Sequence, residues 1–195
     1  MLISDKNKFI FVHVPKTGGT SVTVALEPHC HNKCKDYKTR PTYLRSRGLS
    51  THMQSRRIPK QIITKNYFIF GFVRNPWTWH VSYYEYIKRR REHNRHNIVK
   101  RQTFAQYIAA KKKAKFTQMF HWVSKCDFVG RTETLQEDFN HVMMELGLPL
   151  IELQQYKNSN IVDYAAYYDD TTRDLVAQLH RGDIERYGYE FPAIG

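Results

Sequence analysis

Residues 9–22 read FIFVHVPKTGGTSV, and within them a lysine, two glycines and three hydroxyl side chains share the six positions 16–21. An apolar run of β-branched and aromatic residues precedes the lysine, and a helix-compatible segment follows the glycines. A strand, a tight glycine turn and a helix start direct several main-chain N–H groups at one point, where the helix dipole is positive. Lys16 adds a full positive charge with three donors. These residues predict a site for a phosphate or sulfate group.

The pattern differs from the nucleoside-triphosphate loop G-x-x-x-x-G-K-[ST], in which the lysine follows the glycines. Here Lys16 precedes Gly18 and Gly19, and no glycine lies close upstream. The alternative is an ordinary strand–turn–helix junction with a tight Gly-Gly turn. The coincidence of Lys, Thr, Gly, Gly, Thr and Ser at the end of an apolar run favours the anion site.

A second group of residues follows the apolar run Tyr67 to Val73. Arg74 leaves the predicted strand end, and Ser82 lies about two turns into the helix that begins near Pro76. The planar guanidinium of arginine binds two phosphate oxygens at once, so both side chains are expected to face one anion. Each residue has a simpler interpretation when it is considered alone. Arg74 would pair with an acidic residue, and Ser82 would be a hydroxyl on the helix surface.

Taken together, the two segments resemble the sulfotransferases that use 3′-phosphoadenosine 5′-phosphosulfate (PAPS). The likeness is to the membrane-type, carbohydrate-modifying branch and its bacterial relatives, including heparan-sulfate 2-O-sulfotransferase-like members. It extends over most of the chain, in the segments Pro15–Ser21, Phe72–Trp77 with Ser82, Asp127–Glu133 with Asp138 and Phe139, and Tyr187–Phe191. One departure is His80, where many relatives carry an arginine two residues before the serine.

The resemblance implies a P-loop NTPase-like three-layer α/β fold and PAPS as cosubstrate, with adenosine 3′,5′-bisphosphate as product and no metal. It implies that Lys16 neutralises the leaving group. Main-chain N–H groups of Thr17, Gly18, Gly19 and Thr20, with the hydroxyls of Thr20 and Ser21, would hold the 5′-phosphate. Arg74 and Ser82 would hold the 3′-phosphate, and Arg131 would approach the nucleotide.

Transfer to a hydroxyl also needs a general base, and histidine suits this role near neutral pH. His52 lies between the two cofactor motifs, in a position that resembles the base-bearing segment of the family. The alternative is that His52 is a polar helix-entry residue, in which case His13, beside the loop, becomes the candidate base. The remaining histidines that we interpret as surface residues are His29, His31, His93, His96, His121 and His180.

Alternating apolar runs and helical segments predict an α/β fold with a mostly parallel central sheet flanked by helices, in a single domain over residues 1–195. We expect strands at about 8–14, 67–73 and 128–129. We expect helices at about 19–27, 55–64, 76–95, 103–113, 135–146 and 171–180, with one more turn at 183–187, and an irregular segment at 28–51. Trp77 and Trp79 could stack on adenine or a sugar, but their helical spacing favours the core.

Charge is unevenly distributed along the chain. Residues 1–125 carry 26 lysines and arginines against 5 aspartates and glutamates, whereas residues 126–195 carry 5 against 13, and the net charge is +13. A basic surface of this extent indicates an anionic ligand. The expected partners are PAPS and a hydroxyl-bearing acceptor, with an anionic glycan among the candidates. For Lys111 to Lys113 alone, a solvated surface is the simpler interpretation.

Two other functions remain as alternatives: a nucleotide or small-molecule kinase, and a basic nucleic-acid-binding module built on residues 88–115. The kinase is disfavoured by the position of Lys16, and nucleic acid is not the expected partner. Zinc at His29, Cys30, His31 and Cys34 is disfavoured because a second ligand pair is missing. The sequence contains no apolar run long enough to span a bilayer and no signal peptide, so we expect a cytoplasmic protein.

Overall fold

The computed structural model describes residues 1–31, 38, 40–63, 66–112, 118–154 and 163–192. The chain divides into two compact units, each built from two separate segments. The first unit comprises residues 1–73 and 119–156, and the second comprises residues 74–118 and 157–195. None of the helices in the described ranges combines the length and apolarity needed to cross a bilayer.

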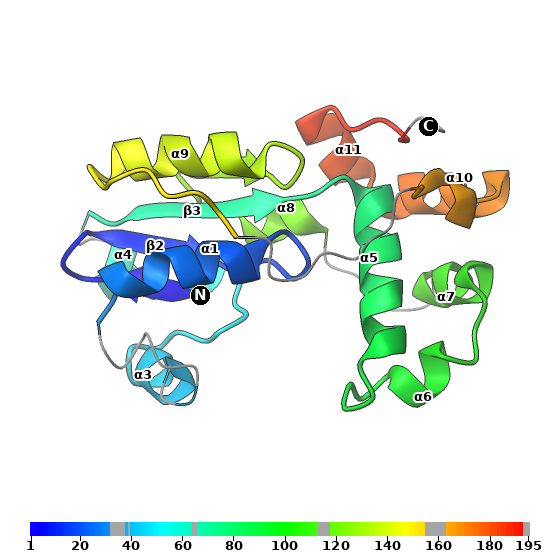
Figure 1. Ribbon diagram of the computed structural model, residues 1–195, viewed down its shortest axis with the longest axis horizontal. Helices are drawn as coiled ribbons and strands as arrows, with labels where there is room; N and C mark the ends of the chain where they lie inside the picture. The colour runs from blue at the N-terminus through cyan, green and yellow to red at the C-terminus, as the bar shows by residue number, and fades with distance from the viewer. Residues whose placement is uncertain (32–37, 39, 64–65, 113–117, 155–162, 193–195) are drawn as a thin grey trace. The chain divides into compact units, whose positions relative to one another are not determined.

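The first unit contains a four-stranded sheet in the order β1-β2-β3-β4 (Figure 1). The strands are β1 (Leu2–Ser4), β2 (Phe9–Val12), β3 (Phe68–Val73) and β4 (Phe128–Arg131). β2, β3 and β4 are parallel, and β1 pairs antiparallel with β2. The mostly parallel sheet is therefore confirmed, and the predicted strands are confirmed with shorter or longer ends. β1 was not expected.

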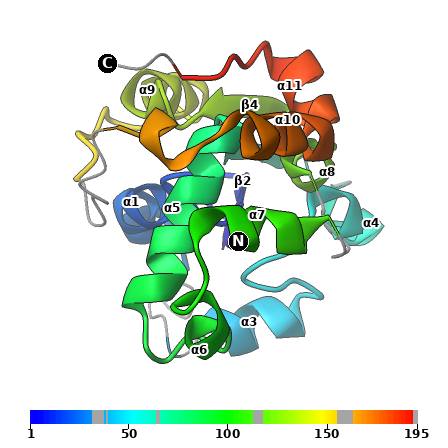
Figure 2. The same cartoon turned by 90° about the vertical axis from the view of Figure 1, so that its right-hand side faces the viewer.

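Helices cover both faces of this sheet. Figures 1 and 2 show α1 (Gly19–Leu26) and α9 (Leu135–Glu145) on one side, and α4 (Lys60–Ile63) and α8 (Met119–Trp122) on the other. Strands covered on both faces must be apolar throughout, and β2 is indeed fully buried. The aromatic rings of the two central strands form the centre of the core, with Phe11 stacked on Phe70 at 5.4 Å between centroids. The three-layer α/β arrangement is confirmed.

In two segments of the first unit the secondary structure differs from the expectation drawn from the sequence. The segment expected to be irregular contains η1 (Glu27–His29) and α3 (Arg40–Ser46), so that expectation was wrong. The helix expected at 55–64 is divided into η2 (Ser55–Arg57) and α4. Ile58 between them is extended, with φ −63° and ψ 128°, because the residue before a proline is disfavoured in the helical region.

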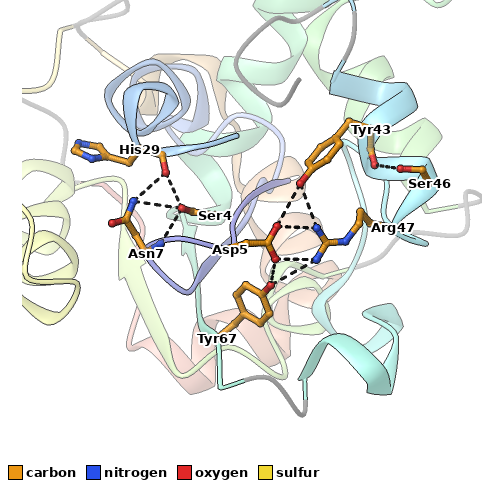
Figure 3. A network of polar contacts seen from close by, with 8 residues as sticks. All are labelled: Ser4, Asp5, Asn7, His29, Tyr43, Ser46, Arg47 and Tyr67. Carbon is orange, nitrogen blue, oxygen red and sulfur yellow. Dashed lines mark hydrogen bonds and ion pairs between the residues drawn. The ribbon is translucent and has the colours of Figure 1, made fainter. Parts of the chain in front are cut away.

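A polar network joins the β1–β2 turn to the end of α3 (Figure 3). The Arg47 guanidinium binds both carboxylate oxygens of Asp5, at 2.7 and 2.9 Å. The hydroxyls of Tyr43 and Tyr67 donate to the same carboxylate. α3, which has few apolar residues of its own, is thus tied to the sheet by charge-assisted hydrogen bonds as well as by buried Leu44.

The second unit is helical in its described residues. It contains α5 (Pro76–Arg89), α6 (His96–Val99), α7 (Phe104–Lys111), η3 (Ala165–Tyr167), α10 (Asp170–Leu179) and α11 (Arg181–Tyr187). α7 and α10 begin with capping boxes at Thr103 and Asp169, which satisfy main-chain donors that a helix start leaves open. The helices expected here are confirmed, except that α5 ends at Arg89 and not at 95.

Candidate functional site

The loop between β2 and α1 passes twice through left-handed backbone. Lys16 has a φ of 67° and Gly18 a φ of 75°. Glycine adopts such angles freely, but for a lysine they cost about 1–3 kcal/mol. Thr17 helps to hold the turn, because its buried hydroxyl donates to the Val14 carbonyl oxygen at 2.9 Å. A Cβ at Gly18 would lie 2.5 Å from Leu135 Cδ2, so α9 also packs closely on the loop.

The first turn of α1 is left open to an anion. Its N-cap is Gly18, which has no side chain to accept from the first N–H groups, and the turn contains no acidic residue. The uncapped donors and the positive end of the helix dipole therefore remain available. Lys16, Thr20 and Ser21 are half-buried around this turn. The arrangement suits a phosphate or sulfate group, as the sequence predicts.

His13 lies against the same turn. A Cβ at Gly19 would come within 2.4 Å of both Cδ2 and Nε2 of the His13 ring. On the strand side, the ring stacks on Phe11 at 5.6 Å between centroids, with the planes 27° apart. Gly19 is therefore required by a close approach of the His13 ring, whereas Gly18 is required by its backbone angle.

His52 is next to His13. The two rings meet edge to face at 5.0 Å between centroids, and His52 Nδ1 lies 3.4 Å from the His13 main-chain oxygen. A carbonyl oxygen only accepts hydrogen bonds, so this contact requires the proton on Nδ1 and leaves the Nε2 lone pair to take a proton. Although His52 is exposed as a residue, desolvation of its ring lowers its pKa below the usual 6.5, against the opposing effect of the His13 carbonyl. A neutral imidazole of this kind is suited to act as a base.

The ends of β3 and β4 are joined beside the start of α9. Thr132 donates from its N–H and from its hydroxyl to the Val73 carbonyl oxygen, at 2.8 and 2.9 Å. Asp138 accepts from the Arg131 N–H and from the Thr134 hydroxyl, both at 2.7 Å. Arg131 is exposed at the carboxyl end of its strand. In open parallel sheets, ligands bind at this end of the strands.

Arg74 and Ser82 belong to the second unit. The half-buried Arg74 donates from Nε to the Thr78 hydroxyl and from one terminal nitrogen to the Tyr164 hydroxyl, both at 3.0 Å. Ser82 is buried, with 4% of its surface exposed. Asn75 caps α5 as expected, accepting from the Trp77 N–H at 3.1 Å. The structure thus groups the Lys16 loop, His13 and His52 within one unit, and places the predicted 3′-phosphate pair in the other.

Trp77 and Trp79 are buried in the second unit, as their spacing favours. The Trp77 indole donates to the Arg173 carbonyl oxygen at 3.0 Å and meets Phe191 edge to face. Trp79 is 8% exposed and stacks on Tyr83 at 5.2 Å. Both indoles therefore serve the core of this unit.

His180 was expected at the surface, and that expectation was wrong. His80, His180 and Asp183 are each fully buried and form a chain of hydrogen bonds. Asp183 accepts from His180 Nδ1 at 2.8 Å, so His180 Nε2 accepts in turn from His80 Nε2 at 3.0 Å when both rings are neutral. Burial lowers the pKa of both histidines. The i, i+3 spacing of His180 and Asp183 was a signal in the sequence for such a pair.

Lys111 was interpreted as a solvated residue, and this was also wrong. It is 5% exposed, and its ammonium lies 4.4 Å from the centre of the Tyr107 ring and 5.5 Å from that of Tyr83. Burial lowers the pKa of Lys111 to about 8, and the charge of Arg95 adds to the effect. Cation–π contacts offset part of the cost of burying the charge.

A cavity of about 550 Å³ lies at the other end of β2, beside the β1–β2 turn and away from the Lys16 loop. Ser4–Asn7, Pro28–His31 and Leu148 line it. Cys34, part of the zinc pattern considered above, lies outside the described residues, as do Lys113 and Lys115. Among the residues that the structure does describe, no three His, Cys, Asp or Glu side chains gather as metal ligands would.

The fold is similar to that of mouse sulfotransferase SULT7A1, solved as a complex with PAP, with a TM-score of 0.60 and 16% sequence identity. The match covers 95% of this chain and 88% of that chain, and at this identity it is a likeness of fold. No curated protein matches the sequence. Residues 1–190 match the family model Sulfotransfer_2, described as the sulfotransferase family, and the chain therefore belongs to the sulfotransferase family.

Proposed function

We propose that this protein transfers the sulfuryl group of PAPS to an acceptor hydroxyl. The observation that carries the proposal is the loop at residues 13–21: a half-buried lysine and an uncapped helix start meet beside two histidines. Because the chain belongs to the sulfotransferase family, we assign this anion site to the phosphosulfate group of PAPS. The structural neighbour crystallised with PAP, the product that PAPS leaves behind, is in keeping with the same cosubstrate.

In this proposal the Lys16 loop binds the 5′-phosphosulfate end of the nucleotide. The main-chain N–H groups of Thr17 to Thr20 and the hydroxyls of Thr20 and Ser21 hold its phosphate. The side-chain hydroxyl of Thr17 is already committed to Val14, so Thr17 contributes only its main chain. Arg74 and Ser82 bind the 3′-phosphate, and Arg131 contacts the nucleotide.

His52 and Lys16 carry the chemical step. His52 Nε2 takes the proton of the acceptor hydroxyl as the acceptor oxygen forms its bond to sulfur. The bond between sulfur and the bridging oxygen breaks, and Lys16 stabilises the negative charge that develops on that oxygen. As in phosphoryl transfer, positioning and charge stabilisation supply most of the rate enhancement. No metal is assigned, because the ammonium, the guanidinium and the amides supply the positive charge.

For the acceptor we propose a carbohydrate hydroxyl, in keeping with the branch of the family that the motifs resemble. The excess of basic residues over positions 1–125 favours an anionic glycan over a neutral one. Location in the cytoplasm and a single functional domain over residues 1–195 remain part of the proposal.

Calorimetric titration tests the nucleotide assignment. Adenosine 3′,5′-bisphosphate should bind without metal and more tightly than ATP, and magnesium should not raise its affinity. Tight ATP binding that depends on magnesium would indicate the kinase instead. Steeply salt-dependent binding of RNA or DNA, with no response to the bisphosphate, would indicate the nucleic-acid-binding module. Radiolabelled PAPS with a panel of neutral and anionic glycans then identifies the acceptor.

A further inference from the structure

We infer that His13 is a positioning residue, which fixes the tautomer of the base His52 and its distance from the phosphate loop. The inference rests on the proposed function, in which His52 accepts the acceptor proton. It assigns separate roles to two adjacent histidines, one for proton transfer and one for geometry.

The His13 ring is held from two directions. Phe11, which is fully buried, stacks on the ring from the strand side. On the loop side the ring lies so close to Gly19 that even one methyl group would not fit between them. A side chain confined between a core aromatic ring and a helix start has little freedom to move, which is the property that a spacer requires.

His52 meets this fixed residue through both its ring and its Nδ1 atom. The edge-to-face contact sets the tilt of the His52 imidazole, with the planes 69° apart. The His13 main-chain oxygen, 3.4 Å from Nδ1, selects the tautomer with its proton on that atom. The lone pair is then on Nε2, the atom that the proposed reaction requires. Tautomer control through the second ring nitrogen is a general means of orienting a histidine base.

The same geometry disfavours His13 as the base. Its Nε2 is one of the two ring atoms closest to the Cβ position of Gly19, so that edge of the ring faces main chain of α1. A base must reach the proton that it abstracts within about 2.6–3.2 Å. His52, which is exposed, meets this requirement of access better than His13, which is half-buried.

Nitrogen NMR on the ¹⁵N-histidine-labelled protein tests the tautomer directly, without any need for turnover. At neutral pH we expect His52 to show a protonated Nδ1 and an unprotonated Nε2. The resonances are assigned by their loss in His52→Gln. A wild-type His52 with its proton on Nε2 would overturn the inference, even if the protein proves to be an active sulfotransferase.

Kinetics separate a positioning role from a chemical one. His13→Ala should lower kcat by ~10–100-fold, because the base loses its support, and should leave KM for PAPS nearly unchanged. His13→Phe restores an aromatic ring, slightly wider than imidazole, without a titratable nitrogen, so we expect it to recover most of kcat as long as it binds adenosine 3′,5′-bisphosphate like the wild type. If His13→Phe binds the nucleotide normally and is still as inactive as His13→Ala, His13 acts as an acid or base itself and the inference is wrong. His141→Ala, at an exposed histidine on α9, is the matched control and should leave kcat and KM for PAPS unchanged.

A paired substitution tests the close contact between the His13 ring and Gly19. Gly19→Ala should weaken binding of adenosine 3′,5′-bisphosphate by ~10-fold or more, since its methyl group collides with the His13 ring and displaces the loop donors. In Gly19→Ala combined with His13→Ala the collision is gone, so nucleotide affinity should recover while kcat stays low. No recovery would refute the close contact. A wild-type protein that fails to bind the nucleotide at all would refute the proposed function instead, and the NMR result would still decide the tautomer.

Discussion

At Lys16 the chain places a full charge on left-handed backbone, a conformation that glycine would adopt at lower cost. Strained backbone at a non-glycine residue persists where the surroundings over-determine it, and it is often found at functional sites. The hydrogen bond from the Thr17 hydroxyl to the Val14 carbonyl oxygen spans Lys16, and the left-handed Gly18 follows directly after Thr17. Stability and chemistry therefore make opposite demands on this position.

Lys16→Gly separates these two demands. We expect sulfuryl transfer to fall by ~1,000-fold or more, because the leaving-group charge is no longer compensated. We expect the free energy of unfolding to rise by up to about 1 kcal/mol, because relief of the left-handed strain is partly offset by the larger backbone entropy that glycine loses on folding. Radiolabel transfer and chemical denaturation measure the two effects. Lys6→Gly, at an exposed lysine in the β1–β2 turn, controls for the loss of one charge; normal turnover in Lys16→Gly would remove Lys16 from the chemistry.

The pKa of His52 predicts how activity depends on pH. Because desolvation lowers this pKa, the imidazole stays neutral, and active as a base, to a lower pH than a free histidine would. The acid limb of kcat/KM, which reports the free enzyme, should therefore have its midpoint below pH 6.5. A midpoint clearly above 6.5 would contradict the environment described for His52, and His52→Ala should abolish the limb together with turnover.

Among the elements, those with long apolar runs were predictable and those held by distant partners were not. β2 and β3 follow from uninterrupted apolar sequence, and α5 from Asn75 and Pro76 at its start. β1 was missed because three residues carry too little pattern. α3 was missed because its sequence, RPTYLRS, is polar, and its attachment depends on Asp5, far away in the chain. Within the site, the Lys16 loop could be read from residue types, but the contact of His13 with Gly19 arises only on folding.

The attachment of α3 can be tested at Asp5. Asp5→Asn removes the charge that Arg47 binds, and we expect the free energy of unfolding to fall by about 1 kcal/mol, since the pair is partly exposed. Arg47 holds the pKa of the Asp5 carboxyl well below its usual range, so the stabilisation is present above about pH 4 and is lost as acid protonates the carboxylate. Urea denaturation at pH 7 and pH 3 should thus show a smaller difference between wild type and variant at pH 3 than at pH 7. Glu152→Gln serves as the exposed control.

The buried histidine chain of the second unit predicts acid sensitivity near pH 6. Burial lowers the pKa of His80 and His180, so below pH 6.5 the unfolded chain takes up protons that the folded protein resists. Stability should then fall with decreasing pH, by up to about 1.4 kcal/mol per pH unit for each such histidine. His80→Gln keeps a donor for His180 but cannot titrate, and it should reduce the slope. An unchanged slope in thermal melts between pH 7 and 5.5 would contradict the burial of His80.

For the whole molecule, the asymmetry of charge predicts how ligands arrive. A net positive charge over residues 1–125 raises the local concentration of a polyanionic nucleotide. Association of adenosine 3′,5′-bisphosphate, followed by stopped-flow, should slow markedly between about 0.01 and 0.15 M salt, because screening shortens the range of the field. Dissociation should change less. A salt-independent association rate would indicate that the basic surface serves another partner.

The interleaving of the two units also constrains how the chain is made. β3 pairs with β4, yet the whole segment from Arg74 to Gln118, which belongs to the other unit, is synthesised between them. During translation the β3 edge is therefore exposed on the ribosome until β4 emerges, and an open edge of this kind is prone to pair with other chains. A chaperone that shields this edge would raise the fraction of newly made protein that reaches its native state. Slow translation of the intervening segment would lower that fraction, because the edge stays open for longer.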